Sequence, residues 1–441
     1  MKRRFKQFVT LIGMVVTFGG ILVWQAYGAD RVYLDITDPS FRKLPIAVPG
    51  FRVDGGSSGI GDDLLSTTKK DLQISGIFQV LDSRAFFSDP QKLGVTAAEI
   101  DFGQFKQVGA EYLIRGSYST DGQNIHLELR FFDVVGRKML LGKAYDGKIQ
   151  DRKLMIHRFV DEILKLITGE VGVFSTKIAF VNKEGKNSRI YMVDFDGSNP
   201  TLLTPREELA MSPSWSSDGR FIAYIGFRGN RTALSILDVS SRAVRDCFLG
   251  GVISSARFNP QKDLIAAAIS RPDGNPEIVG VDLAGNVTGR LVSGGWNTKT
   301  SPSWSPDGRK IAYVSNETGS PQIYVYDVST GSKRRITFSG DYNTSPSWSP
   351  KGDWIAYSGL VEGHHHIFIV NSETLSVMQI TNGSYNNEAP TWSPDGRMIA
   401  FQSNRSGRNA IWVMLRNGAD ARLLTEMPGD QILPSWSPRF Q

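Results

Sequence analysis

The chain contains few residues with reactive side chains. Its 441 residues include one cysteine, Cys247, and five histidines. A single cysteine excludes an intramolecular disulfide, so the fold must be held together by its core. Walker, dinucleotide-binding and Cys-x-x-Cys motifs are also missing from the sequence. The sequence therefore excludes a disulfide-stapled scaffold and gives no support to a nucleotide-dependent or thiol-redox enzyme.

The chain also lacks a strong excess of charge. The formal net charge is +6, and Lys2, Arg3, Arg4 and Lys6 supply four of these charges. The remainder is too small to favour a nucleic acid or a membrane surface as a partner. Apolar residues make up 40% of the chain, which is typical of a globular protein, and 45 glycines indicate many turns.

The first 28 residues have the organisation of a secretory signal peptide. Basic residues are followed by an apolar run from Phe8 to Trp24, and Ala26 and Gly28 fit positions −3 and −1 of a cleavage site. An uncleaved anchor is the alternative, but about 17 apolar residues are at the lower limit for a membrane-spanning helix. We expect cleavage between Gly28 and Ala29. No cysteine stands there to carry a lipid, so we expect a periplasmic protein that is not embedded in the membrane.

One short motif recurs through the second half of the chain. Five copies place a proline two residues before an aromatic residue, as in Ser301-Pro-Ser-Trp304-Ser, and the aromatic residue returns about every 44 residues. The aromatic positions are Trp215, Phe258, Trp304, Trp348, Trp392 and Trp436. This period is typical of a β-propeller with four strands per blade, in which the aromatic side chain packs between neighbouring sheets.

The number of repeats predicts how the ring closes. Second-strand segments starting with Ile-Ala occur six times, from Ile178 to Ile399. The first segment has no aromatic strand before it, and the last aromatic strand, around Trp436, has no strands after it. We expect residues 434–438 to lie beside Ile178, because this pairing removes two open sheet edges. The sequence thus predicts a six-bladed all-β propeller over residues 171–441, closed by its C-terminal strand.

Residues 41–170 have a different pattern and predict a small α/β domain, which makes the whole chain an α+β multidomain protein. Strands are expected at 44–49, 78–82, 111–118, 124–134 and 138–145, and helices at 61–74, 99–108 and 153–168. The last helix has the clearest periodicity. Its apolar residues, such as Met155, Phe159 and Ile163, recur every three or four positions, and Gly169 follows as a stop.

Two features of the α/β domain could be mistaken for catalytic groups. Residues 55–59, Gly-Gly-Ser-Ser-Gly, match the nucleophile elbow of hydrolases. We interpret them as a flexible loop, because the domain is too small for a hydrolase sheet. His126 falls in a predicted strand and His157 on the core-facing helix, so we interpret both as structural or exposed. We assign no catalytic residue.

Metal and cofactor sites are also not predicted. His364, His365 and His366 are adjacent, and side chains on an extended segment point alternately to opposite sides, so three rarely converge on one ion. We interpret them as the solvated edge of a loop between the second and third strands of a blade. Asp218, Asp307 and Asp395 precede glycines, and we interpret them as turn formers.

The repeat Ser-Pro-Ser-Trp-Ser-Pro-Asp-Gly-Arg-Lys-Ile-Ala-Tyr, at 301–313, resembles the propeller repeats of the TolB family of the Tol–Pal envelope system. It also resembles propellers of prolyl-oligopeptidase-type peptidases, but no residues remain here to encode a hydrolase domain. An exported chain, an α/β domain, the linker at 174–181 and six blades are together similar to the TolB family over essentially all of residues 29–441. The segments 31–35 and 44–49 also look like the first segment of that family.

The resemblance implies that the propeller docks the peptidoglycan-associated lipoprotein Pal at one mouth of its channel. In the family the contacts lie in loops that lead into the inner strands. The matching positions are Val252, Ser255, Thr300, Asn343, Thr344, Asn387 and Glu388. The third repeat departs from the family pattern at Val252, where the family has a histidine. It also has Gln261-Lys262-Asp263 in place of the Asp-Gly turn.

The resemblance also implies that an N-terminal arm, residues 29–40, binds the C-terminal domain of TolA by strand addition. The candidate residues are Ala29, Asp30, Arg31, Val32, Tyr33, Leu34 and Asp35. Pal binding on the propeller would change whether this arm is free, which is communication between distinct sites. The implied protein is a non-enzymatic periplasmic monomer that supports outer-membrane integrity and cell division.

Two other functions stay open from the residues alone. A lactonase-like propeller enzyme would need inward carboxylates or histidines around a metal ion in the channel. A cell-wall or glycan-binding module would bind carbohydrate in place of protein. Metal analysis and a pull-down from envelope extract would separate these hypotheses from the protein-binding function.

Overall fold

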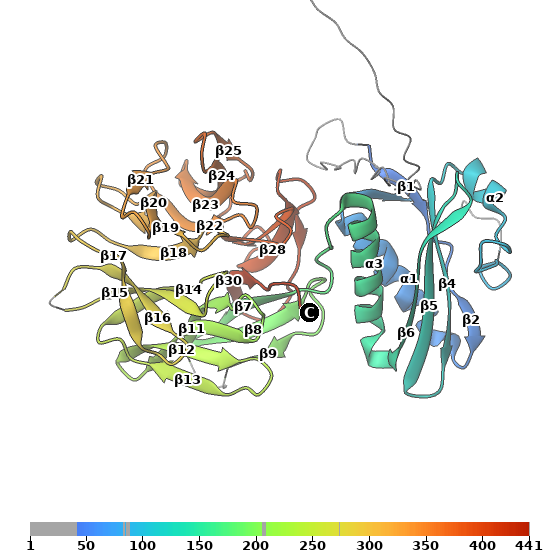
Figure 1. The fold of residues 1–441 in the computed structure, drawn as a ribbon, viewed down its shortest axis with the longest axis horizontal. Coiled ribbons are helices and arrows are strands. Elements are labelled where there is room, and N and C mark those ends of the chain that lie inside the picture. The colour runs from blue at the N-terminus through green and yellow to red at the C-terminus, as the bar shows by residue number, and fades with distance from the viewer. Residues whose placement is uncertain (1–41, 83, 85–88, 205–208, 273, 441) are drawn as a thin grey trace, which may run out of the picture. The chain divides into compact units, whose positions relative to one another are not determined.

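The structure is a computed structural model that describes residues 42–82, 84, 89–204, 209–272 and 274–440. The predicted signal peptide, its cleavage site and the N-terminal arm lie outside the described residues. These three predictions therefore stay predictions. The described residues form an α/β domain followed by a β-propeller, which confirms the predicted fold class (Figure 1).

The α/β domain is built on one mixed sheet. Its strands are β1 (Leu44–Ala47), β2 (Arg52–Gly55), β3 (Phe78–Val80), β4 (Tyr112–Thr120), β5 (Asn124–Asp133) and β6 (Lys138–Lys148), and its α-helices are α1 (Gly61–Ile74), α2 (Phe102–Gln107) and α3 (Arg152–Thr168). The strand order is β3-β1-β4-β5-β6, and β2 pairs with β4. Strand β1 is parallel to both of its neighbours, while β4, β5 and β6 form an antiparallel meander.

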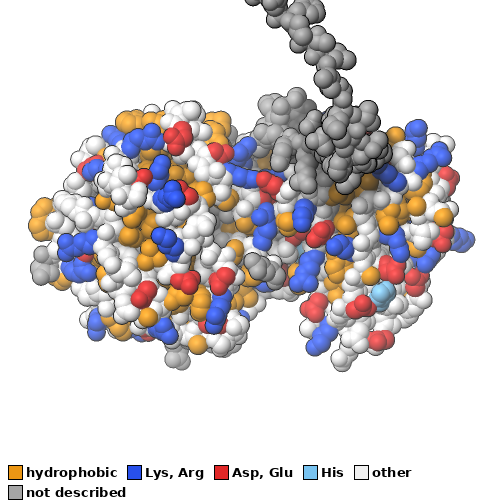
Figure 2. Space-filling model, viewed as in Figure 1, with side chains coloured by type: hydrophobic (Ala, Val, Ile, Leu, Met, Phe, Trp, Pro, Cys, Tyr) orange, Lys and Arg blue, Asp and Glu red, His pale blue; other side chains and the backbone are white. Residues whose placement is uncertain are grey.

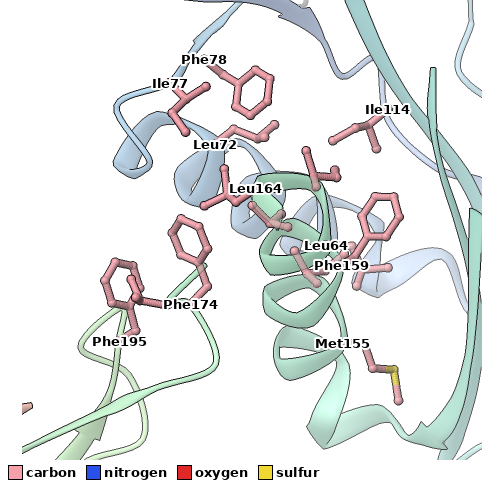
Figure 3. Close-up of a cluster of buried hydrophobic side chains, with 14 of the residues drawn as sticks. Leu64, Leu72, Ile77, Phe78, Ile114, Met155, Phe159, Leu164, Phe174 and Phe195 are labelled. Carbon is pink, nitrogen blue, oxygen red and sulfur yellow. The ribbon is translucent and has the colours of Figure 1, made fainter. Parts of the chain in front are cut away.

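Helices cover both faces of this sheet. Leu64 of α1 and Phe159 of α3 belong to one buried cluster with Ile114 of β4 (Figure 3). Phe105 of α2 belongs to a second cluster with Leu113 of β4. Leu113 and Ile114 are neighbours in the chain, and successive strand residues point to opposite faces, so α2 lies on the face opposite α1 and α3.

Two predicted elements of this domain differ from the structure. The segment 55–59, expected as a flexible loop, contains the end of β2 and a 3₁₀ helix, η1 (Ser58–Ile60). Gly56 has φ of +80°, and a Cβ there would lie 2.2 Å from the Thr120 carbonyl oxygen, so this glycine permits a close backbone approach. The helix expected from residue 99 begins at Phe102. Asp101 caps it by accepting a 2.9 Å hydrogen bond from the Gly103 N–H.

The propeller consists of six four-stranded antiparallel sheets. The strands of each blade are given from the inner to the outer one. Blade one consists of β30 (Asp430–Trp436), β7 (Lys177–Glu184), β8 (Asn187–Asp194) and β9 (Thr201–Leu202), and blade two of β10 (Ala210–Trp215), β11 (Phe221–Arg228), β12 (Arg231–Asp238) and β13 (Val244–Cys247). Blade three consists of β14 (Val252–Phe258), β15 (Leu264–Ser270), β16 (Glu277–Asp282) and β17 (Val287–Val292), and blade four of β18 (Thr300–Trp304), β19 (Lys310–Ser315), β20 (Gln322–Asp327) and β21 (Lys333–Arg335). Blade five consists of β22 (Asn343–Trp348), β23 (Trp354–Val361), β24 (His364–Asn371) and β25 (Val377–Gln379), and blade six of β26 (Asn387–Trp392), β27 (Met398–Ser403), β28 (Ala410–Leu415) and β29 (Arg422–Leu423).

The C-terminal strand closes the ring, as the repeat count predicts. Strand β30 pairs antiparallel with β7, and Trp436 stands opposite Ile178. The Trp436 indole N–H also donates a 2.8 Å hydrogen bond to the Thr176 hydroxyl. The first blade is therefore made from both ends of the propeller sequence, and the inner edge of β7 is paired.

The repeated aromatic residues join neighbouring blades. The indole N–H of Trp215 donates to the Ser435 carbonyl, and the indole N–H of Trp392 donates to the Ser347 carbonyl, at 3.1 and 2.9 Å. In both pairs the acceptor lies on the inner strand of the preceding blade. These bonds satisfy a polar group that burial would otherwise leave without water.

Candidate functional site

The two ends of the propeller channel differ in the parts of the chain that form them. The inner strands β10, β14, β18, β22, β26 and β30 each begin at one end, here called the entry mouth, and finish with their aromatic residue at the other end, the exit mouth. Each inner strand is antiparallel to the second strand of its blade, so the hairpins between second and third strands also lie at the entry mouth.

The structure brings all seven Pal-binding candidates to the entry mouth. Val252, Thr300, Asn343 and Asn387 are the first residues of β14, β18, β22 and β26. Ser255, Thr344 and Glu388 follow on the same strands. Val252 is 62% exposed, whereas Ser255, Asn343 and Asn387 are buried. A partner that binds this mouth can contact the exposed candidates directly, but not the three buried ones.

The buried candidates fasten the loops that enter the inner strands. The Asn343 side-chain amide donates to the Gln322 side-chain oxygen and to the Ser339 carbonyl, both at 2.9 Å. The Ser255 hydroxyl accepts a 2.9 Å hydrogen bond from the Ser301 N–H of the next blade. These contacts fix the shape of the entry mouth rather than present groups on its surface.

Asn387 holds an arginine in an aromatic cage. Its side-chain oxygen accepts a 2.7 Å hydrogen bond from Arg405. The Arg405 guanidinium lies 4.6 Å from the ring centre of Trp412 and 4.7 Å from that of Tyr385. Burial lowers the pKa of Arg405. Cation–π contacts of this kind stabilise a guanidinium that has lost part of its water.

The three adjacent histidines are strand residues, so their prediction as a solvated loop edge is wrong. They begin β24, and His366 is 5% exposed. The prediction failed because β24 extends to the end of its hairpin, where His365 pairs with Leu360 of β23. His365 and His366 point to different neighbours: the His365 imidazole lies 3.8 Å from the Glu388 carboxylate, and His366 lies 3.4 Å from the Asn387 amide. Within the described residues, no group of three or more His, Cys, Asp or Glu side chains could hold a metal ion.

Sequence reasoning missed the main surface feature of the entry mouth, which is a set of exposed apolar side chains. Trp296 is 76% exposed and Phe338 is 64% exposed. The set comprises Leu209, Met211, Phe227, Phe248, Val252, Trp296, Phe338 and Tyr342. A signal was present, because Phe248, Trp296 and Phe338 each lie within two residues of a glycine in the loop before an inner strand. We name these eight residues the apolar rim.

Basic side chains support the aromatic members of the apolar rim. The Lys299 ammonium donates to the carbonyls of Gly295 and Asn297, which flank Trp296, at 3.2 and 3.0 Å. Burial lowers the pKa of Lys299. Arg231 stacks on Phe248, with 4.4 Å from its guanidinium carbon to the ring centre. The backbone around Trp296 and the ring of Phe248 are therefore held in place.

A cavity of about 450 Å³ opens at the entry mouth between blades two and three. Arg231, Phe248, Val252 and Arg271 are among the residues that line it. The Arg271 guanidinium forms an ion pair with Glu277. The cavity thus combines apolar walls with a guanidinium, which suits an amphipathic side chain of a partner.

The face drawn in Figure 2 shows no field of a single charge. Lys and Arg side chains are interspersed with Asp and Glu on the face drawn in Figure 2. None of the helices in the described part of the chain combines the length and the hydropathy that a bilayer crossing requires. The apolar rim is therefore the feature of the propeller that indicates binding most clearly.

A six-bladed propeller that follows a small α/β domain defines the structural class of this protein. Two family models match the chain, the TolB amino-terminal domain over residues 32–140 and the TolB β-propeller domain over residues 164–440. The chain belongs to the TolB family.

Individual relatives agree with this assignment. "Protein TolB homolog" of Chlorobium chlorochromatii is 34% identical over 70% of each chain. "Tol-Pal system protein TolB" of Desulfosudis oleivorans is 38% identical over 60% of this chain and 61% of its own length, so the chain matches less than two thirds of that relative. The crystal structure of TolB from Acinetobacter baumannii is 25% identical, has a TM-score of 0.76, and is covered over 97% of its chain.

Proposed function

We propose that this protein is the periplasmic protein-binding component of a Tol–Pal envelope system. It docks Pal on the entry mouth of the propeller and TolA through residues 29–40, and it supports outer-membrane integrity and cell division. It acts by binding and not as an enzyme. The observation that carries the proposal is the apolar rim, because exposed aromatic side chains are typical anchors of protein interfaces.

The candidates fall into two roles in this proposal. Val252, Thr300, Thr344 and Glu388 contact Pal, since each is at least partly exposed. Ser255, Asn343 and Asn387 act through the loops that they fasten. Trp296 and Phe338 supply the anchors that the sequence candidates lack. The bonds of Lys299 to the backbone around Trp296, and Arg335 over the Phe338 ring, reduce the entropy lost on binding.

Binding of purified Pal to the wild-type protein and to Trp296→Ala tests the propeller site. We expect Trp296→Ala to weaken the Kd at least about tenfold, the range of an interface hot spot. Val377→Ala is the matched control, because Val377 is also exposed but lies on the outer strand β25. Equal weakening by both variants, or by neither, would contradict the assignment of the site. Thr300→Arg places a bulky charge at the start of β18, at the entry mouth, and we expect it to weaken Pal binding without unfolding the propeller.

Removal of residues 29–37 from the mature chain tests the arm. We expect loss of binding to the TolA C-terminal domain and unchanged binding to Pal, measured by calorimetry on the same preparation. Retained TolA binding would show that the arm is not the site. A wild-type protein that binds neither partner, but is retained on purified cell-wall glycan, would replace the proposed function with a glycan-binding one.

A further inference from the structure

The hairpin between the second and third strands is built in the same way in blades four and six. In each, an asparagine side chain accepts a 2.8 Å hydrogen bond from a backbone N–H in the loop that leads into the inner strand, and these asparagines are Asn316 and Asn404. The carbonyl of each asparagine also accepts from the N–H of a glycine three residues later. The residues that follow the asparagines, Glu317 and Arg405, therefore hold equivalent positions in the two blades.

Blade four uses this position for a charge pair. The Lys333 ammonium donates a 2.5 Å hydrogen bond to the Glu317 carboxylate, and it lies 5.9 Å from the ring centre of Tyr324. Lys333 is the first residue of the outer strand β21. The two opposite charges compensate each other, so this corner of blade four needs no external ion.

Blade six has lost the partner of this pair. Strand β29 pairs with β28 in the same register as β21 pairs with β20, and in both blades an isoleucine N–H of the third strand donates to a threonine after the fourth strand. This register places Ala421 where blade four has Lys333. A methyl group thus replaces a long cationic side chain, and the cation Arg405 replaces the acid.

The contacts of Arg405 leave its charge uncompensated. Its Nε donates a 3.0 Å hydrogen bond to the Ser403 hydroxyl, and its Nη2 donates a 2.7 Å bond to the Asn387 side-chain oxygen. Both acceptors are neutral. Burial lowers the pKa of Arg405, and no carboxylate of the described residues acts against this shift. The third nitrogen, Nη1, makes no hydrogen bond within the described part of the chain.

Arg115 of the α/β domain shows how a structural buried arginine is satisfied in this chain. Its guanidinium donates from Nε, Nη1 and Nη2 to the backbone carbonyls of four residues, so all three nitrogens have acceptors. Arg405 differs, because one nitrogen has no acceptor and the residue is only half-buried. The aromatic rings around Arg405 stabilise the cation but are not carboxylate or carbonyl acceptors for Nη1. This nitrogen is therefore available to a ligand.

A cavity of about 700 Å³ opens between blades five and six, and Arg405 itself lines it. Ala421 lines the same cavity, so no long side chain from this position fills the space. Side chains with amide and hydroxyl groups supply the other polar lining: Gln379, Thr381, Asn382, Tyr385 and Asn417. None of the described residues that line this cavity lies on an inner strand or belongs to the apolar rim. The cavity is therefore separate from the channel and from the proposed Pal surface.

One wall of the cavity is fixed by a close contact between the two blades. Gly418, in the turn before β29, has φ of +86°, and a Cβ there would lie 2.2 Å from the Ile380 carbonyl oxygen. Only glycine permits this approach of the blade-six turn to the end of the outer strand of blade five. The Asn417 side-chain oxygen accepts a 3.0 Å hydrogen bond from the Ala419 N–H, which holds the same turn.

We propose that this cavity binds an acidic sugar, whose carboxylate accepts a hydrogen bond from Nη1 of Arg405. A single uncompensated cation suits a ligand with one carboxylate, because a charge-assisted hydrogen bond is stronger than a neutral one. Amide and hydroxyl side chains both donate and accept, as the hydroxyls of a sugar do. The volume lies in the usual range of small-molecule sites. Asn382 and Tyr385 have no side-chain hydrogen bonds within the described residues, so both can bond the sugar ring.

Ligand-observed NMR titration of the full chain, at constant ionic strength, tests the site with three probes. Glucuronate has a sugar ring and a carboxylate, glucose has the ring without the carboxylate, and acetate has the carboxylate alone. We expect glucuronate to bind at least about tenfold more tightly than either of the other two. Absence of glucuronate binding, or equal binding of glucuronate and acetate, would overturn the proposal.

Variants of Ala421 connect the binding to Arg405. Ala421→Glu places a carboxylate where blade four has Lys333, so it should pair with Arg405 and weaken glucuronate binding at least about tenfold. Ala421→Gln is the matched control, since it has the same size without the charge and should keep most of the affinity. Ala421 is exposed, so both variants should fold.

A second variant removes the cation itself. Arg405→Gln should bind glucuronate no more tightly than glucose, because the charge-assisted hydrogen bond is lost. Equal affinity of the wild type and Ala421→Glu for glucuronate would show that the carboxylate does not lie at Arg405, and would overturn the assignment of the site.

Discussion

The two mouths of the propeller are made by the same six repeats, yet their loops differ in the side chains that they carry. At the exit mouth, the Ser305 hydroxyl donates to the Asp307 carboxylate at 2.5 Å, and that carboxylate also accepts from the Arg309 N–H. Ser216 with Asp218 and Ser393 with Asp395 form the same turn. At the entry mouth a different unit recurs in four blades, where the hydroxyl of a threonine after the fourth strand accepts a hydrogen bond from an isoleucine N–H of the third strand. The loops that follow these threonines expose large apolar side chains.

This difference separates the part of each repeat that stabilises the scaffold from the part that can vary for binding. In blades two, four and six the exit-mouth turn satisfies its own polar groups, and it directly follows the aromatic residue of the inner strand. Beside the shared threonine contact, the entry loops have contacts that occur in single blades, such as the bonds from Lys299 to the carbonyls around Trp296. Because the exit-mouth turns stabilise the scaffold, the entry loops can vary in sequence from blade to blade.

The largest expected effect comes from breaking the strand that spans both mouths. Deletion of residues 432–441 removes most of β30 and leaves β7 without its inner neighbour. We expect loss of cooperative unfolding of the propeller, measured by calorimetry, because two sheet edges open at once. Deletion of Gln441 alone is the control and should melt as the wild type does. A truncated chain with the wild-type transition would show that closure does not hold the ring.

At the entry mouth, Lys299→Met should reduce binding more than stability. The substitution keeps the length of the side chain but removes both hydrogen bonds that hold the Trp296 loop. We expect Pal binding to weaken severalfold, while the free energy of unfolding changes by no more than about 1 kcal/mol. Calorimetric titration and urea unfolding measure the two quantities. Unchanged affinity for Pal would mean that binding does not need the two hydrogen bonds that hold the Trp296 loop.

At the exit mouth, Asp307→Ala should have the opposite selectivity. It removes the acceptor of the Ser305 hydroxyl and of the Arg309 N–H, and we expect a loss of about 1 kcal/mol in the free energy of unfolding. Pal affinity should not change, because this turn lies at the far end of the inner strand. Weaker Pal binding in a variant that is still folded would contradict the claim that Pal binds only at the entry mouth.

The smallest expected effect is a difference in pH dependence between the mouths. Burial lowers the pKa of His366, so near its unfolded pKa the unfolded chain binds more protons there than the folded chain does. Its contribution to stability is therefore present above the unfolded pKa, about 6.5, and is lost as the pH falls below it. A protonated His366 would also turn its Nδ1 from an acceptor into a donor that faces the Asn387 amide.

Exit-mouth carboxylates lose their contribution at lower pH. The Ser305 hydroxyl lowers the pKa of Asp307, so the stability from that turn is present above the unfolded pKa of an aspartate, about 3.9, and is lost only in more acidic solution. We expect His366→Gln to flatten the pH dependence of Tm between about pH 7 and 5 and to leave the more acidic region unchanged. An unaltered profile between these values would contradict the role of His366.

The sequence predicted the parts of this protein that local patterns determine. The aromatic period, the Ile-Ala segments and the unpaired strand around Trp436 were enough to predict six blades and their closure. The turn role of Asp307 followed from its glycine neighbour and is confirmed by its contacts. These features depend on backbone geometry and on side chains close in the chain.

Features that depend on distant partners were not predictable in the same way. His157 is buried because its ring lies 2.7 Å from the Asp71 carboxylate, across two helices whose packing no local pattern specifies. Asn343 is buried because Gln322 of the preceding blade accepts its amide. Trp296 is exposed because Lys299 bonds the backbone around it rather than because its own chemistry favours water.

Hydrogen exchange of the full chain with and without purified Pal tests the central claim most directly. The account predicts slower exchange in the loops at 248–252, 293–300 and 336–344, which carry Phe248, Trp296 and Phe338, and no change in the turns at 216–220, 305–310 and 393–398. Protection of those exit-mouth turns, with the entry loops exchanging as in the free protein, would contradict it.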